Sequence, residues 1–438
     1  MVVSIIEKVY SFLWGDWIKI PLPGGGSLGI SLLIILLIPT GIYFTIRTKF
    51  LQIRLFPDMV RALVAKKEHK DSLSTFQTLI VSTATRVGMG NLVGVVAAVS
   101  AGGAGAVFWM WITALIGSAT AFIEATLAQL HKEKDPLYGG YRGGPAYYIH
   151  HFFEEKSGKK KKHVLVAVAS VIVLRKNATV KVLDMIVPIM AVCYFFITLF
   201  IIIVNFRSIP GVFGRIFEEA FGIRQVVSGG FGAVLMNGVK RGLFSNEAGS
   251  GSAPCAAAAA ECDNPVRAGL TQALGVFIDT IIICSCTAMI MLIAPEKIIA
   301  GKAGMDLLQS AMQYHLGRFG VIFIALTLFL FSFSTFLGIL FYARSNVAYL
   351  FGDKWIWQTL YKIVALIMLF IGGIATYTFV WDLGDVGIGL MTIFNIGMLY
   401  LMGGQALKPL SEYEKEKKTE RDSNQNPAAG IIFFEEEK

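Results

Sequence analysis

The feature that most constrains this chain is a succession of long apolar segments that runs almost from one end to the other. An apolar helix of about 20 residues spans the ~30 Å hydrocarbon core of a bilayer. Only 16% of the 438 residues are charged, whereas a soluble protein has roughly a quarter. The sequence therefore predicts an all-α polytopic membrane protein, with full spans near residues 28–48, 76–101, 104–130, 182–206, 226–260, 265–293, 319–350, 357–379 and 386–405.

The net charge of +9 is carried by short basic stretches between the apolar segments. Lys and Arg gather at 49–71, at 131–162 and after 406, and such basic loops face the cytoplasm. This distribution explains the charge without a nucleic-acid partner. It predicts that residues 1–27 form an extracytoplasmic segment and that 411–438 form a cytoplasmic tail. The tail is charged and poor in apolar residues, so we expect it to be mostly disordered.

The same charge pattern restricts the segment 163–181. Both of its flanks are predicted to be cytoplasmic, so the chain between them must cross the membrane an even number of times. The apolar run within 163–174 has 11 residues, which as a helix is about 16 Å long, roughly half of the hydrocarbon core. We therefore expect this run to lie in the interface or to dip in and return, which leaves nine full spans.

The second span is interrupted near its middle by Thr85–Gly94, which contains Arg86, Asn91 and several glycines. Glycine loosens a helix, and a break at this depth frees backbone amides for a carboxylate and carbonyls for a cation. The glycine spacing also resembles a dinucleotide loop, but that interpretation requires a soluble strand–turn–helix unit. Close helix packing through small residues remains an alternative.

The span 226–260 is interrupted more strongly, by Asn237–Pro254. Lys240, Arg241 and Glu247 cannot face lipid, because each central charge costs roughly 3 kcal/mol or more there. The segment has serines but no Gly-x-Ser-x-Gly elbow, so a hydrolase is disfavoured. A simple cytoplasmic loop at 247–254 stays open. Two interrupted spans indicate the two halves of an inverted repeat, with a binding site between the breaks.

Two further positions carry candidate chemistry. Asp279 lies inside an apolar segment, where an acid is a candidate cation ligand, proton acceptor or partner of an intramembrane cation. A salt bridge from Asp279 to Arg86, Lys240 or Arg241 is the structural alternative, so Asp279 and Arg86 are the coupling candidates. Ser334 and Thr335 lie mid-span; such hydroxyls often bond to their own helix, but beside a broken helix they suit a sodium ion.

Four segments together resemble a known family: Gly102–Gly117, Gly143–Tyr148, Phe244–Pro254 and Phe333–Gly338. They are similar to the signature sequences of the sodium:alanine symporter family, also called alanine or glycine:cation symporters. The resemblance covers about residues 28–410. It implies a LeuT-like fold, with one extra leading helix followed by two inverted five-helix repeats. It also implies a prokaryotic plasma-membrane protein that is not an enzyme.

The resemblance further implies sodium-coupled transport of a small neutral amino acid, such as alanine or glycine, by alternating access. Sodium is then the coupling ion, and no cofactor is expected. Carried over by position, the substrate would be held by the backbone amides around Met89, Gly90 and Asn91 and lined by Phe244 and Ser245. The sodium site would consist of the carbonyls of Ala84 and Val87 and the hydroxyls of Ser334 and Thr335.

Two features depart from the family pattern. Met89 stands where many members have a smaller Thr, which would reshape the pocket. The first repeat is also about 30 residues shorter than the family pattern, with a junction near Ser170–Val171 inside 163–181. The alternative hypothesis is therefore a transport-deficient or ligand-binding-only member of the family.

Overall fold

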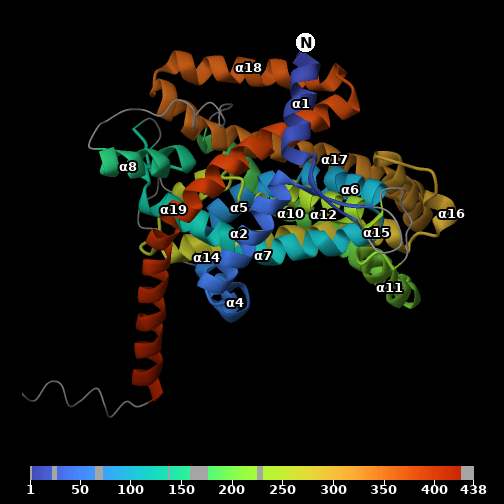
Figure 1. Cartoon of the computed structure of the whole chain (residues 1–438), viewed down its shortest axis with the longest axis horizontal. Helices are drawn as coiled ribbons and strands as arrows, with labels where there is room; N and C mark the ends of the chain where they lie inside the picture. The colour runs from blue at the N-terminus through green and yellow to red at the C-terminus, as the bar shows by residue number, and fades with distance from the viewer. Residues whose placement is uncertain are drawn as a thin grey trace, which may run out of the picture.

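The computed structural model describes residues 2–21, 27–64, 73–136, 139–157, 176–223 and 230–425. Helices dominate it, with two short antiparallel hairpins (Figure 1). The first part contains α1 (Val2–Trp14), β1 (Asp16–Pro21), β2 (Ser27–Ser31), α2 (Leu32–Arg47), α3 (Leu51–Arg54), α4 (Phe56–Arg61), η1 (Ala62–Val64), α5 (Thr75–Arg86), η2 (Gly90–Gly94), α6 (Val95–Gly102), α7 (Gly105–Leu130), β3 (Glu133–Lys134), β4 (Tyr141–Arg142) and α8 (Pro145–Ser157).

The second part contains the remaining helices. They are α10 (Lys176–Val204), η3 (Phe206–Ser208), α11 (Ile209–Ala220), α12 (Gly230–Asn246), α13 (Pro254–Ala258), α14 (Pro265–Val276), η4 (Phe277–Cys284), α15 (Ser285–Ile293), α16 (Glu296–Ile299), α17 (Met305–Phe351), α18 (Trp355–Ile374) and α19 (Tyr377–Gln425). The segments η2 and η4 are π-helical, and α17 is kinked at Gly317.

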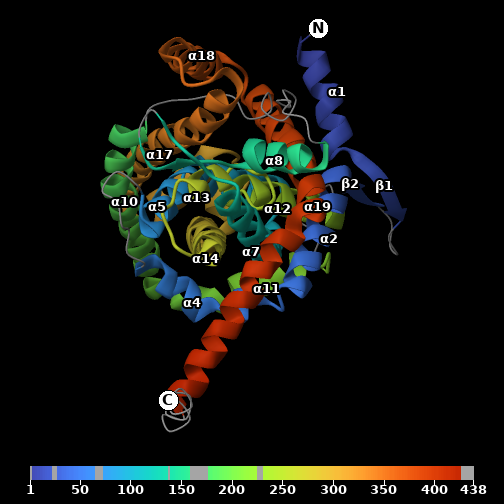
Figure 2. The same cartoon turned by 90° about the vertical axis from the view of Figure 1, so that its left-hand side faces the viewer.

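Helix α7 forms the centre of the molecule, packed against α12, α14 and α2 (Figure 2). Small residues allow these backbones to approach closely, as is common between membrane helices. A Cβ added at Gly238 of α12 would lie 2.5 Å from the Cβ of Trp109, and one at Gly269 of α14 would lie 2.4 Å from Thr126 Oγ1. Helix α12, which leads into the second interrupted segment, and helix α14 are therefore held against a common central helix.

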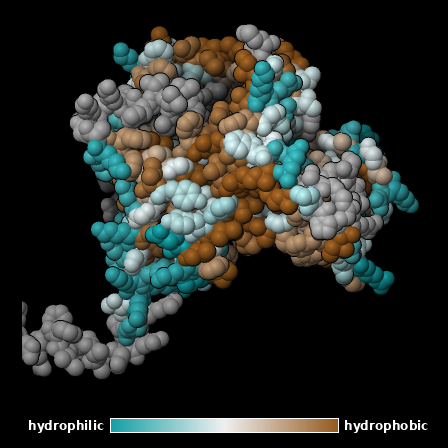
Figure 3. Space-filling view, in the orientation of Figure 1, coloured by the Kyte–Doolittle hydropathy of each residue, from teal (hydrophilic) through white to brown (hydrophobic). Residues whose placement is uncertain are grey.

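Six described helices are long and apolar enough to cross a membrane, and the bent pair α5 and η2–α6 makes a seventh candidate. The prediction of a polytopic all-α membrane protein is confirmed. Helix α2 is shorter, with 16 residues, and the predicted span 226–260 consists of α12, an irregular stretch and α13. An apolar area extends across the middle of the face shown in Figure 3.

The expectation of a mostly disordered tail is wrong for residues 411–425, which continue α19 as a helix that projects from the body (Figure 1). Composition did not predict this helix, because the helix is stabilised by ion pairs with residues of α3 and α4. Arg54 Nη2 lies 2.6 Å from Glu414 Oε1, and Lys417 pairs with the buried Asp58 of α4. The predicted shortening near 163–181 lies for the most part outside the described residues, so it stays a prediction.

Candidate functional site

The second span is broken, as predicted, and the break lies at Val87–Met89. Helix α5 ends at Arg86, and the two halves of the span are bent by 47°. The amides after the bend do not continue the α-helical pattern. Gly88 N donates to Arg86 O at 2.8 Å, Asn91 N donates to Gly88 O at 3.2 Å, and Met89 N donates to Thr335 Oγ1 at 3.3 Å.

This rerouting releases the carbonyl groups on the other side of the break. In a regular helix the amides of Gly88 and Asn91 would bond to the carbonyls of Ala84 and Val87, four residues earlier. Both donate elsewhere, and Ala84 and Val87 are fully buried. The two carbonyls predicted for the sodium site are thus those that lose their helical partners.

Thr335 of α17 lies directly against the break. A Cβ added at Gly88 would lie 1.6 Å from Thr335 Oγ1, so only glycine leaves room for this hydroxyl. The neighbouring Ser334 is buried and donates to Phe331 O at 2.9 Å, the back-bonding that is common for serine in helices. The structure therefore brings Thr335 to the break, while the hydroxyl of Ser334 is used within its own helix.

A buried carboxylate joins the break to two other elements. Asp279 of η4 accepts from Asn91 Nδ2 at 2.9 Å, from Ser245 Oγ at 2.7 Å and from Thr280 Oγ1 at 2.8 Å. All four residues are buried, and π-helical segments such as η2 and η4 occur often at functional sites. The side chains that donate these hydrogen bonds to Asp279 are neutral.

The alternative of a salt bridge to Asp279 is not found among the described residues. Lys240 and Arg241 pair instead with Asp385 of α19, at 2.5 Å from Nζ to Oδ2 and 3.0 Å from Nη1 to Oδ1. Sequence reasoning did not single out Asp385, which is fully buried. Its position beside an apolar segment was the available signal, because a buried cation pair requires an acid.

Arg86 is the other coupling candidate, and it is 1% exposed. Its Nη1 donates to Gln272 O at 3.4 Å, whereas Nε and Nη2 have no hydrogen-bond partner in the part of the chain that the structure describes. A buried guanidinium without a paired carboxylate is costly. Arg86 therefore offers two free donors beside the break.

The predicted substrate residues lie where η2 crosses the end of α12. A Cβ added at Gly90 would lie 3.1 Å from Ser245 Cα, which shows how closely the two backbones approach. The Phe244 ring packs against Trp381 with 5.1 Å between ring centroids. Met89 is 37% exposed. The Met89 and Asn91 amides already have partners, so a carboxylate bound by either of these two amides would have to replace that partner.

The irregular stretch 247–253 is enclosed by other parts of the protein, and the cytoplasmic loop at 247–254 stays an alternative interpretation. Its residues are buried or half-buried, and Glu124 of α7 holds it in place. Gly249 N donates to Glu124 Oε2 at 3.0 Å and Gly251 N donates to Oε1 at 3.1 Å, while the Asn395 amide donates to the same carboxylate. Sequence reasoning missed Glu124, although an acid inside the apolar segment 104–130 was a signal.

Comparisons with known proteins identify a family of membrane transporters. A model of the sodium:alanine symporter family matches residues 25–172 and 161–427. The chain is 39% identical over 431 residues to the probable sodium/glutamine symporter GlnT of Bacillus subtilis, covering 90% of each chain. It is 37% identical over 420 residues to the amino-acid carrier protein AlsT of the same organism, covering 87% of this chain and 89% of the relative. It is 33% identical over 468 residues to the sodium/alanine symporter AgcS of Methanococcus maripaludis, covering 95% and 98%.

Proposed function

Because the chain belongs to the sodium:alanine symporter family, we propose that it transports a small neutral amino acid, such as alanine or glycine, together with sodium. It is a multi-pass membrane transporter and not an enzyme. We place it in a prokaryotic plasma membrane, with the N-terminus outside and the C-terminus in the cytoplasm. Its partners are then the amino acid, the sodium ion and the lipid bilayer.

The observation that carries this proposal is the break at Val87–Met89 with Thr335 lying against it. Sodium is a hard cation that prefers oxygen ligands, and a broken membrane helix supplies them as released carbonyls. Ala84 and Val87 provide such carbonyls, and Thr335 provides a hydroxyl that lies against Gly88 and Met89 at the break. Ser334 would complete the site by giving up its bond to Phe331.

Asp279 supplies the negative charge that coupling requires. Its carboxylate is fully buried and reaches both the break, through Asn91, and the end of α12, through Ser245. A cation or proton bound at this carboxylate would therefore influence both interrupted segments at once. Arg86, whose Nε and Nη2 have no hydrogen-bond partner among the described residues, would balance the buried negative charge nearby.

The substrate would lie between the same two segments. The amides around Met89, Gly90 and Asn91 mark the start of a half-helix, where a carboxylate is favoured. Phe244 and Ser245 form the facing wall. A LeuT-like arrangement of two inverted repeats behind one leading helix places both breaks at the bilayer midplane, and we propose this arrangement for the chain.

Uptake into proteoliposomes tests the proposal. Radiolabelled alanine, glycine and glutamine would be offered separately, with an inward sodium gradient or with potassium in its place. The proposal expects accumulation of at least one of them only with sodium. Uptake that is equal in potassium would contradict the coupling, and uptake of glutamine alone would replace the proposed substrate.

The alternative of a transport-deficient or binding-only protein has no support in the comparisons. The relatives named above align over 89–98% of their own lengths. Binding of substrate without sodium-dependent flux in the same vesicles would favour that alternative.

A further inference from the structure

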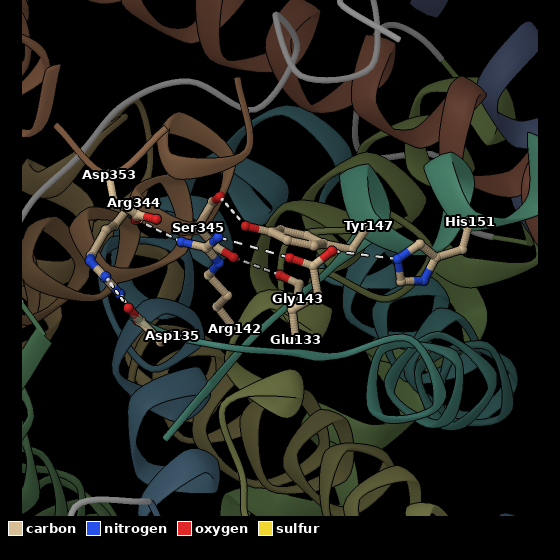
Figure 4. Close-up of polar contacts among 9 residues, drawn as sticks. All are labelled: Glu133, Asp135, Arg142, Gly143, Tyr147, His151, Arg344, Ser345 and Asp353. Carbon is tan, nitrogen blue, oxygen red and sulfur yellow. Dashed lines mark hydrogen bonds and ion pairs between the residues drawn. The ribbon is translucent and has the colours of Figure 1, made fainter. Parts of the chain in front are cut away.

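Between α7 and α8, Glu133, Asp135, Arg142 and Gly143 belong to a polar cluster that is attached to the end of α17 (Figure 4). Arg344 of α17 forms a buried ion pair with Asp135, and Arg142 Nη1 of β4 lies 2.6 Å from Asp353 Oδ1. Two hydrogen bonds add to this attachment, from Tyr147 Oη to Ser345 O at 2.9 Å and from Ser345 Oγ to Gly143 O at 2.8 Å. This side of the cluster is held by two ion pairs and two hydrogen bonds.

The other side of the cluster reaches α19 through two histidines. His151 Nε2 of α8 lies 3.4 Å from Glu133 Oε1 of β3. His151 Nδ1 lies 3.2 Å from Nδ1 of His131, which caps the C-terminus of α7. His131 Nε2 lies 2.8 Å from Gln405 Oε1 of α19. Four separate elements are thus joined in one row of contacts.

The contacts of this row limit how many hydrogens it can hold. The Glu133 carboxylate is an acceptor, so His151 carries a hydrogen on Nε2. The facing Nδ1 atoms need one hydrogen between them. The Gln405 amide can present either its oxygen or its NH2 group to His131 Nε2, so two or three ring hydrogens satisfy every contact. With four hydrogens the two Nδ1–H groups oppose each other and both rings are charged.

We propose that His131 and His151 form an acid-sensitive tie that joins α7 and α8 to α19 and is released when both rings are protonated. The two histidines lie outside the membrane-spanning segments and apart from the residues proposed for sodium and substrate. The neutral pair and the singly protonated pair satisfy all three contacts, whereas the doubly protonated pair does not. The tie is therefore present at higher pH and is lost as the pH falls.

The surroundings favour stepwise protonation of the two rings. The hydrogen bond that His151 donates to Glu133 raises the pKa of His151, and burial lowers the pKa of His131, from an ordinary value of about 6.5 for both. As pH falls, His151 is protonated first. At lower pH His131 gains the second proton and the tie breaks.

The other charged groups near the pair are consistent with one bound proton. Glu154 and Glu155 of α8 add negative charge that favours a proton on His151. His150 is directed to Glu154 at 3.3 Å, and Arg142 lies 3.8 Å from Glu133. Lys132 Nζ donates to Gln129 and to Ala260 O. From α19 the facing group is Gln405, which is uncharged.

The consequence for transport rests on the proposed function. Helix α17 carries Thr335, and α19 carries Asp385, the partner of the two cations in α12. A tie between the α17-bound cluster and α19 restricts the relative movement of these helices at one end. Transport should then depend on the pH of the compartment that this end faces.

Nuclear magnetic resonance of the full chain in nanodiscs, with ¹⁵N-labelled histidine, tests the site itself. The six histidines would be assigned by single His→Gln variants. We expect His151 to titrate above the ordinary value and His131 below it, and His151→Gln to shift the titration of His131. Independent titration of both near the ordinary value would overturn the proposal.

Uptake as a function of the pH inside and outside the vesicles tests the consequence. We expect uptake by the wild-type chain to change several-fold as the pH falls through the range in which the tie is lost, and a flattened profile for His131→Gln. The matched control His150→Gln should keep this change. If His131→Gln does not fold, Gln405→Leu removes the far partner instead. A flat wild-type profile with normal uptake would refute the link to transport, whereas shifted titrations without any uptake would refute the proposed function alone.

Discussion

Replacing Gly88 with alanine perturbs the proposed sodium site at the hydroxyl oxygen of Thr335. The added Cβ would lie 1.6 Å from Thr335 Oγ1, 3.0 Å from Thr335 Cβ and 3.2 Å from Phe331 O. Gly88 does not have a positive φ, so backbone strain does not enter. The hydroxyl must move, and with it the acceptor of the Met89 amide is lost.

The size of the effect follows from two terms. Forcing a methyl group into a filled space costs about 1–3 kcal/mol, and losing one hydrogen bond or ligand contact costs about 1 kcal/mol. Each 1.4 kcal/mol corresponds to roughly tenfold in affinity. If the strain falls on the sodium-bound state, the half-saturating sodium concentration for uptake should rise about 10-fold, and by up to about 100-fold.

The assay is amino-acid uptake at increasing sodium concentration, with Gly94→Ala as the matched control. Gly94 lies in the same broken span, and a Cβ added there meets nothing within 4 Å, so its sodium dependence should stay within about twofold. In a Thr335→Ala background, Gly88→Ala should add much less, because both changes act on one contact. An unchanged sodium dependence in Gly88→Ala would refute the assignment of Thr335.

Three further changes test other parts of the account. Asp279→Asn should lower sodium-dependent uptake by at least about tenfold, the effect of about 1.4 kcal/mol, and uptake that keeps its sodium dependence would remove Asp279 from coupling. Glu124→Gln weakens the bonds from Gly249 and Gly251, each worth about 1.5–3 kcal/mol when the acceptor is charged, so the melting temperature in detergent should fall; an equal melting temperature would contradict this role. Lys417→Ala leaves the buried Asp58 without its ammonium partner, so the end of α19 should be cleaved faster by protease than in the exposed control Lys418→Ala, and equal rates would contradict the contact.

Local signals in the sequence were enough to locate the two breaks. Glycines and polar residues inside apolar segments, as at Gly88 and Asn91, have few explanations in a membrane, because an unpaired polar group there is costly. The same reasoning identified Asp279. In each case the residue type alone excluded contact with lipid, and the neighbouring sequence supplied the rest.

Partners distant in the sequence could not be predicted in this way. Asp385 neutralises Lys240 and Arg241 from about 140 residues away, and the sequence offered Asp279 as an equally suitable partner. The helix of residues 411–425 depends on pairs with α3 and α4, which composition cannot reveal. Tertiary contacts decided both outcomes.

The central claim is that amino-acid movement and sodium movement are coupled at the break in the second span. The most direct test follows radioactive sodium and the labelled amino acid together in the same proteoliposomes, for the wild-type chain and for Gly88→Ala. The account predicts that the amino acid drives sodium entry at a fixed ratio, and that Gly88→Ala requires more sodium to reach the same flux. Amino-acid entry without accompanying sodium, or identical sodium requirements in the two proteins, would contradict it.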